Sequence, residues 1–132
     1  MLNLCICDDD PKDTARVREL AEAFLQKHPE FPLSIETFSS PCDLLDRMDT
    51  KGAFDLCLLD ILMPQMEGLE LARAIRTRHR AAEIIFLTAS PEFALDAFDV
   101  EACGYLVKPV EPEKFSRTLL TAAQRLTRPE NR

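Results

Sequence analysis

Acidic, hydroxyl and amino side chains stand directly after four of the apolar runs in this 132-residue sequence. A short apolar run bounded by turn-forming residues is typical of a strand buried on both faces of a parallel sheet. Open α/β sheets bind their ligands outside the carboxyl ends of such strands, so side chains placed there can converge on one pocket. In chain order they are Asp8 and Asp9, Asp60, Thr88 and Lys108.

The residue types in this set indicate phosphoryl transfer. Three neighbouring carboxylates repel one another, and the pKa of each is raised unless a cation lies among them. Oxygen-only ligands favour Mg²⁺, which also binds phosphate oxygens. Lys108 and Thr88 could bind the other phosphoryl oxygens in the charged transition state. Taken alone, Asp60 is a nucleophile, a metal ligand or a buried structural acid, but in this company it is a competent phosphoryl acceptor.

Strands and helices alternate along the chain, which predicts an α/β fold with a doubly wound parallel sheet covered by helices on both faces. Proline after Asp10 and after Ser40 gives a helix cap followed by proline at the first helical position. The predicted strands are 2–7, 33–38, 56–59, 83–88 and 103–107, the second nearer an edge. The predicted helices are 11–28, 41–48, 68–80, 91–98 and about 112–126.

Composition limits the class of protein. The length suits one domain, and 46% hydrophobic residues argue against disorder. A net charge of −7 argues against a nucleic-acid surface on this chain. We see no signal peptide and no apolar stretch near the roughly 20 residues of a membrane span. Five cysteines, mostly inside apolar runs, fit a reducing cytoplasm. Cys5 and Cys7 share one strand face, where core packing is a better interpretation than a soft metal site.

Taken together, these pieces resemble a response-regulator receiver domain of two-component signalling, the CheY-like family, over residues 2–126. Each piece is weak alone, but all of them in order on compatible elements are specific. The resemblance implies a flavodoxin-like fold with strand order 2-1-3-4-5 and five helices, with the domain over 1–127 and a polar tail or linker over 128–132. The matching pieces are Asp8-Asp9, Leu-Leu-Asp60-Ile-Leu-Met-Pro64 with Gly68, Thr88-Ala89, and Tyr105-Leu-Val-Lys108-Pro109.

The resemblance also implies roles for the site residues. Asp60 would accept a phosphoryl group from the phosphohistidine of a sensor histidine kinase, with Mg²⁺ or Mn²⁺ bound. Such a domain is a signalling switch, at most catalysing its own phosphotransfer and dephosphorylation, rather than an enzyme. Family members have a cis peptide at the position of Lys108–Pro109. The implied roles are Asp9, Asp60 and the Leu62 carbonyl as metal ligands, Asp8 as an indirect ligand, Lys108 and Thr88 as phosphoryl contacts, and Thr88 with Tyr105 as the switch.

A finer similarity is to receivers of the LytTR class of transcriptional regulators. It lies in residues 7–11 and in residues 90–102 running into Tyr105-Leu-Val-Lys108-Pro109. Those regulators carry a DNA-binding domain after the receiver, so DNA binding would belong to an output domain absent from this chain. We further expect a homodimer through the face made by the fourth helix, fifth strand and fifth helix, a cytoplasmic location and no membrane contact.

Three other functions have weaker support in the sequence. Asp8-x-Asp10 loosely resembles the haloacid-dehalogenase phosphohydrolase motif, but Lys12 stands where that motif has Thr or Val, and there is no cap domain. A nucleotide- or flavin-binding module is poorly supported, because the chain has three glycines and no glycine-rich loop after the first strand. A degenerate receiver that binds partners without phosphorylation is opposed only by the completeness of the pocket.

Overall fold

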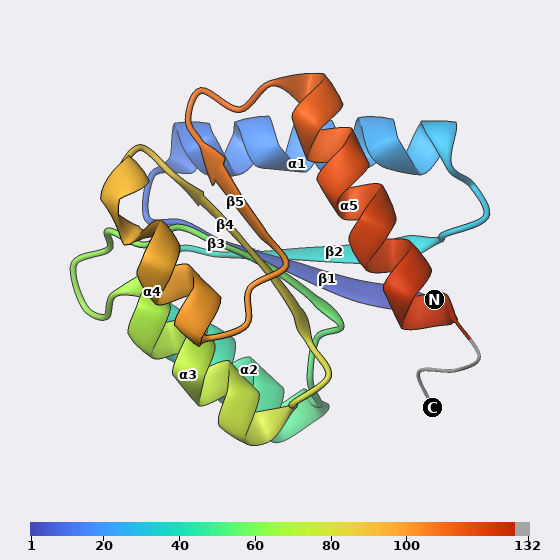
Figure 1. The fold of residues 1–132 in the computed structure, drawn as a ribbon. Coiled ribbons are helices and arrows are strands. Elements are labelled where there is room, and N and C mark those ends of the chain that lie inside the picture. The colour runs from blue at the N-terminus through green and yellow to red at the C-terminus, as the bar shows by residue number, and fades with distance from the viewer. Residues whose placement is uncertain (129–132) are drawn as a thin grey trace.

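The computed structural model describes residues 1–128, which form a five-stranded sheet with helices on both faces (Figure 1). The strand order is β2-β1-β3-β4-β5, and every neighbouring pair is parallel. This confirms the predicted fold class and strand order, including the edge position of the second strand. The strands are β1 Leu2–Cys7, β2 Leu33–Phe38, β3 Leu56–Leu59, β4 Glu83–Thr88 and β5 Gly104–Val107.

Helices α1 and α5 lie on one face of the sheet, and α2, α3 and α4 lie on the other (Figure 1). Parallel strands need crossover connections, and these helices supply them while covering apolar strand surface. A 3-10 turn, η1, immediately precedes α4. The bounds are α1 Pro11–Lys27, α2 Pro41–Lys51, α3 Gly68–Arg78, η1 Pro91–Phe93, α4 Ala94–Asp99 and α5 Pro112–Thr127.

The central strand β3 divides its four buried side chains between two cores. Cys57 and Leu59 face the core shared with α2 and α3, whereas Leu56 and Leu58 face the core shared with α1 and α5. This alternation follows from the two-residue period of a strand, and it explains why the sequence has a continuous apolar run there. The run ends at Asp60, which therefore lies at the carboxyl end of this central strand.

The sequence signals for the starts of helices and strands were confirmed at some positions and not at others. Asp10 caps α1, since its side chain accepts a hydrogen bond from the Lys12 amide at 2.9 Å. Ser40 precedes α2 but makes no side-chain capping bond, because its hydroxyl donates to Gln65 at 3.2 Å. The predicted helix after Ser90 begins as the 3-10 turn η1, and Cys103 precedes β5 instead of starting it.

Within residues 1–128, no helix has both the length and the apolar character that crossing a membrane requires. Residues 129–132, most of the expected tail or linker, lie outside the described residues.

Candidate functional site

The predicted site residues gather at the carboxyl edge of the sheet, each placed there by the end of a different strand. Asp8 follows β1, Asp60 follows β3, Thr88 ends β4 and Lys108 follows β5. Within the described chain, the buried polar residues are Asp8, Asp60 and Thr88, whose whole-residue exposed fractions are 3%, 9% and 1%. Asp9 is exposed. Polar groups this enclosed need partners, and those partners define the chemistry of the site.

Three carboxylates form the centre of the site. One oxygen each from Asp8, Asp9 and Asp60 lies within 4.8 Å of the other two. The second Asp8 oxygen, Oδ1, accepts from the Asp10 amide at 2.9 Å, and Asp60 Oδ1 accepts from the Ile61 amide at 2.7 Å. Backbone donors therefore fix two of the three side chains. The donor set consists of hard oxygens only, which fits Mg²⁺ or Mn²⁺.

Lys108 supplies the positive charge of this site. Its Nζ lies 2.8 Å from Asp8 Oδ2, 2.8 Å from Asp13 Oδ2 and 3.3 Å from Asp60 Oδ2. Burial alone would lower the pKa of Lys108, but the hydrogen bonds to Asp13 and Asp8 outweigh it and the pKa is raised. The ammonium therefore stays charged across the physiological range.

The contact of Lys108 with Asp13 was not predicted. Asp13 lies in the first turn of α1, where an acid is ordinarily explained by the helix dipole. The sequence holds no local signal for this contact, because Asp9 and Asp10 precede the helix and Asp13 meets Lys108 only through the packing of α1 near the end of β5.

The electrostatic balance at Asp8 shows how much the site depends on cations. Burial raises the pKa of this carboxyl above its ordinary value, while the hydrogen bond from Lys108 and the Asp10 amide oppose the rise and the charge of Asp60 adds to it. A buried acid beside another acid is stable as an anion only with positive charge nearby. The single Lys108 ammonium contacts the carboxylates of Asp8, Asp13 and Asp60. The site therefore keeps a net negative charge, which a metal ion would neutralise.

Thr88 and Tyr105 lie beside the acidic centre, on β4 and β5. The Thr88 hydroxyl accepts a hydrogen bond from the Ser90 amide at 3.3 Å. The Tyr105 hydroxyl donates to the Ser90 carbonyl and accepts from the Phe93 amide at 3.2 Å. Its ring centroid lies 6.4 Å from that of Phe86 and the side chain packs against the core. Both residues thus bond the segment that leads into α4.

The loop after Asp60 is shaped by close backbone contacts. The Gly68 amide donates to the Ile61 carbonyl at 2.8 Å, which folds the loop back over the end of β3. Leu62, the predicted carbonyl ligand, has a side chain that is 51% exposed. The Lys108–Pro109 peptide is cis, as predicted.

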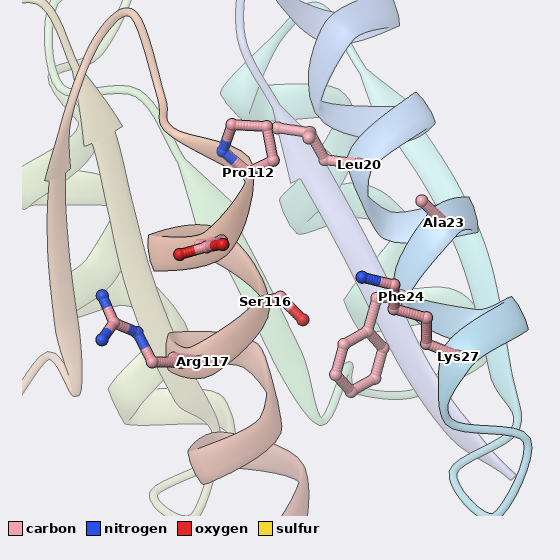
Figure 2. Close-up of a pocket in the computed structure, with 8 residues that line it drawn as sticks. Leu20, Ala23, Phe24, Lys27, Pro112, Ser116 and Arg117 are labelled. Atoms are coloured by element: carbon pink, nitrogen blue, oxygen red, sulfur yellow. The ribbon is translucent and has the colours of Figure 1, made fainter.

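The hollows of the surface do not all belong to this site. A groove of about 280 Å³ between α1 and α5 is lined by Leu20, Phe24 and Arg117 among others (Figure 2). None of the predicted site residues lines it. Below the carboxylates, the structure encloses only about 10 Å³ beside Asp8 and Asp60. Apolar core side chains make up most of the lining of this space, so it is a small gap in the packing and not a ligand pocket.

Comparison with known proteins agrees with this geometry. Residues 4–120 match the family model "Response regulator receiver domain". The "Positive alginate biosynthesis regulatory protein" of Pseudomonas aeruginosa is 36% identical over 123 residues, covering 93% of this chain and 48% of the relative. The "Sensory transduction protein LytT" of Enterococcus faecalis is 31% identical over 132 residues, covering 98% of this chain and 52% of the relative.

Solved structures give the same result. The response regulator TrrA of Thermotoga maritima, in complex with Mg²⁺ and a beryllium fluoride, is 30% identical with a TM-score of 0.72, covering 92% of this chain and 99% of that one. The fold is that of the receiver domains of two-component systems. The chain belongs to the response-regulator receiver domain family. It spans about half the length of the relatives that it matches.

Proposed function

We propose that Asp60 accepts a phosphoryl group from the phosphohistidine of a sensor histidine kinase. The observation that carries this proposal is the joint presence of three carboxylates within 4.8 Å and a lysine ammonium 3.3 Å from Asp60. A lone buried acid would have neither an adjacent cation nor further acids that repel it. Sites that combine such groups are where phosphoryl oxygens and a divalent ion can be held together.

The transfer conserves atoms and charge. An Asp60 carboxylate oxygen bonds to phosphorus as the phosphorus–nitrogen bond of the phosphohistidine breaks, and the released imidazole nitrogen keeps the electron pair. Lys108 stands beside the acceptor oxygen, since its Nζ contacts Asp60 Oδ2. In that position its ammonium can donate to a phosphoryl oxygen as charge develops. Thr88, buried at the end of the neighbouring strand, supplies a hydroxyl for a second phosphoryl oxygen.

The residues that would hold Mg²⁺ or Mn²⁺ are Asp9 and Asp60 with the Leu62 carbonyl, and Asp8 would act indirectly. When bound, the ion supplies positive charge to the acceptor and to the phosphoryl oxygens. Support comes from the oxygen-only donor set and from the excess of acids over lysine. Asp9, the exposed member, is the one open to water and to an incoming ion.

The output of the switch would be a change at the face of α4, β5 and α5. Thr88 and Tyr105 both bond the segment at Ser90, so a Thr88 hydroxyl drawn toward a phosphoryl group would alter the contacts of α4. Two large apolar side chains of α4 are exposed on that face, since Leu95 and Phe98 are 83% and 79% accessible. We propose that it forms a homodimer after phosphorylation.

The relatives are about twice as long as this chain and include regulators of transcription by name, such as "Transcriptional regulatory protein BtsR" of Escherichia coli. We propose that residues 1–127 are the receiver of a LytTR-class regulator and that residues 128–132 begin the linker to a DNA-binding output domain. The natural protein would work in the cytoplasm, where sensor kinases present their phosphohistidine.

Intact-mass spectrometry tests the proposal. The chain is incubated with Mg²⁺ and acetyl phosphate or a phosphorylated histidine kinase, beside the variant Asp60→Asn. We expect one phosphoryl adduct, lost in the variant and lost on chelation of Mg²⁺. No adduct from either donor would leave Asp60 a structural acid and favour a degenerate receiver. Sustained phosphate release from phosphomonoesters would favour a hydrolase instead.

A further inference from the structure

All three N–H donors of the Lys108 ammonium are engaged in this structure. A lysine Nζ carries three N–H donors, and three carboxylate oxygens lie within 3.3 Å of it. A phosphoryl oxygen that arrives at Asp60 can receive a hydrogen bond from Lys108 only if one of these three acids loses its hydrogen bond from Lys108. The environment of the three acids before phosphorylation therefore determines which of them loses its hydrogen bond to Lys108.

The three acids differ in their access to water. The Asp8 side chain is 4% exposed and the Asp60 side chain 11%, whereas the Asp13 side chain is 40% exposed. A carboxylate that loses an ion pair while enclosed is left with an uncompensated charge, at high cost. A carboxylate that water can reach is hydrated instead, and the cost is small. Asp13 is therefore the partner that Lys108 can leave most easily.

The longer contact of Lys108, 3.3 Å to Asp60, does not change this conclusion. Asp60 is the acceptor, and Lys108 has to remain beside it while the phosphoryl group arrives. Asp8 is fixed by the Asp10 amide at the end of β1 and cannot follow the lysine or withdraw from it. Asp13 projects from the first turn of α1, a separate element, and needs only a side-chain rotation to withdraw.

We infer that Asp13 is a positioning residue that holds Lys108 in the resting state and competes with phosphoryl oxygens for its protons. The inference rests on the proposed function of Asp60. Asp13 also adds a partly exposed negative charge next to Lys108, which repels an anionic donor. Both effects weaken the binding of phosphoryl groups to the unphosphorylated chain, so that removing the Asp13 charge strengthens it.

The first test measures binding without any reaction. Fluoroberyllate is a phosphoryl mimic, and its bound fraction is followed by fluorine NMR in the presence of Mg²⁺ for the unaltered chain and for Asp13→Asn. We expect binding roughly two- to fivefold tighter in the variant, the range for a partly exposed ion pair. Asp13→Glu keeps the carboxylate and should bind as the unaltered chain does. Glu19→Gln removes one exposed negative charge from the same helix and should have no effect.

The second test separates binding from chemistry. With phosphoramidate as donor, we expect the half-saturating concentration to fall in Asp13→Asn by the same factor while the maximal rate stays within about twofold. A general loss of stability would lower the maximal rate or the active fraction and would not produce this pattern. Asp13→Ser is a second variant without the charge, to be used if Asp13→Asn does not fold.

Each outcome has a defined meaning. Binding and half-saturation equal to those of the unaltered chain would show that the Asp13 contact is an inert ion pair, and the inference would be wrong. Weaker binding in Asp13→Asn would show that Asp13 supports Lys108 in its working position, which also overturns the inference. If the unaltered chain forms no adduct and binds no fluoroberyllate, the proposed function of Asp60 fails, whatever the role of Asp13.

Discussion

Gly68 is packed against the backbone of Asp60. A Cβ built on Gly68 would lie 2.0 Å from the Asp60 carbonyl oxygen and 2.8 Å from the Cα of Ile61. These neighbours are backbone atoms of Asp60 and of the residue after it, so they cannot move aside without displacing the carboxylate of Asp60. The requirement for glycine here is one of space, not of backbone conformation.

Gly68→Ala should therefore destabilise the domain and disturb the acceptor together. We expect a loss of about 3 kcal/mol in the free energy of unfolding, because overpacking against backbone is not relieved by side-chain rotation. Urea denaturation would measure it. Gly104→Ala is the matched comparison, since the atom nearest to a Cβ there is the Thr118 methyl group at 2.6 Å, which belongs to a side chain and not to the backbone. An equal loss in both variants would contradict the argument.

Lys108→Met should make stability depend strongly on pH. Without the ammonium, Asp8 and Asp60 share a buried site with no protein cation, and we expect a loss of about 2–3 kcal/mol at pH 7. The pKa of Asp8, already raised by burial, would rise further. The folded state would then bind more protons than the unfolded state, so stability should recover as pH falls toward 5.

Denaturation of Lys108→Met with and without Mg²⁺ completes that experiment. The ion should restore part of the lost stability, because it replaces the missing positive charge among the acids. Lys114→Met, which removes an exposed lysine in the first turn of α5, should show neither the pH dependence nor the recovery. A stability of Lys108→Met that is flat between pH 5 and 7 would rule out this electrostatic account.

Arg76 joins α3 to the end of α4. Its Nε donates to the Val100 carbonyl at 3.1 Å and its Nη2 to the Glu101 carbonyl at 2.9 Å, while Nη1 donates to Ala82. Glu101 has a φ of 59°, an unfavourable conformation for a residue with a side chain. Arg76→Met should cost about 2 kcal/mol and speed amide exchange at Val100 and Glu101. Unaltered exchange at Val100 and Glu101 would refute this account. An equal effect of Arg16→Met, which removes an exposed arginine from α1, would refute it as well.

The buried thiols predict a loss of stability at alkaline pH. Burial, with a contribution from the charge of Asp8, raises the pKa of Cys7 from 9.0 to about 12, and burial also raises that of Cys103 to about 12. Between these values the unfolded chain loses thiol protons that the folded chain keeps. Stability should therefore decline as pH rises above 9. Denaturation midpoints between pH 7 and 10.5 would measure the decline, and Cys7→Ala should make it shallower.

Iodoacetamide gives an independent check of the same thiols. Cys42 is exposed in α2, so the native protein should be alkylated there first. Cys5, Cys7 and Cys57 are buried and should react only after unfolding. Rapid labelling of Cys7 in the native state would show that the core beside the acidic site opens more readily than its packing implies.

Much of the fold and the site could be predicted from the sequence, for identifiable reasons. The apolar run ending at Asp60 indicates a strand buried on both faces. Asp10-Pro11 and Pro112 mark the starts of helices, because proline suits the first helical position whatever the tertiary structure. Asp13 escaped prediction because its contact with Lys108 spans 95 positions and depends on how α1 is rotated against β5. Ser40 has a capping sequence, but tertiary structure offers its hydroxyl the side chain of Gln65 instead.

The contact between Lys108 and Asp8 joins positions 100 residues apart. Closing so long a loop costs chain entropy, which the rest of the fold has to offset before the two charges can meet. The cluster of Asp8, Asp60 and Lys108 is consequently complete only when the last strand has paired with the sheet. A nascent chain or an amino-terminal fragment lacking β5 would carry Asp60 without its ammonium ion. On the proposed function, phosphotransfer to Asp60 would then require that the chain has been synthesised and folded through β5.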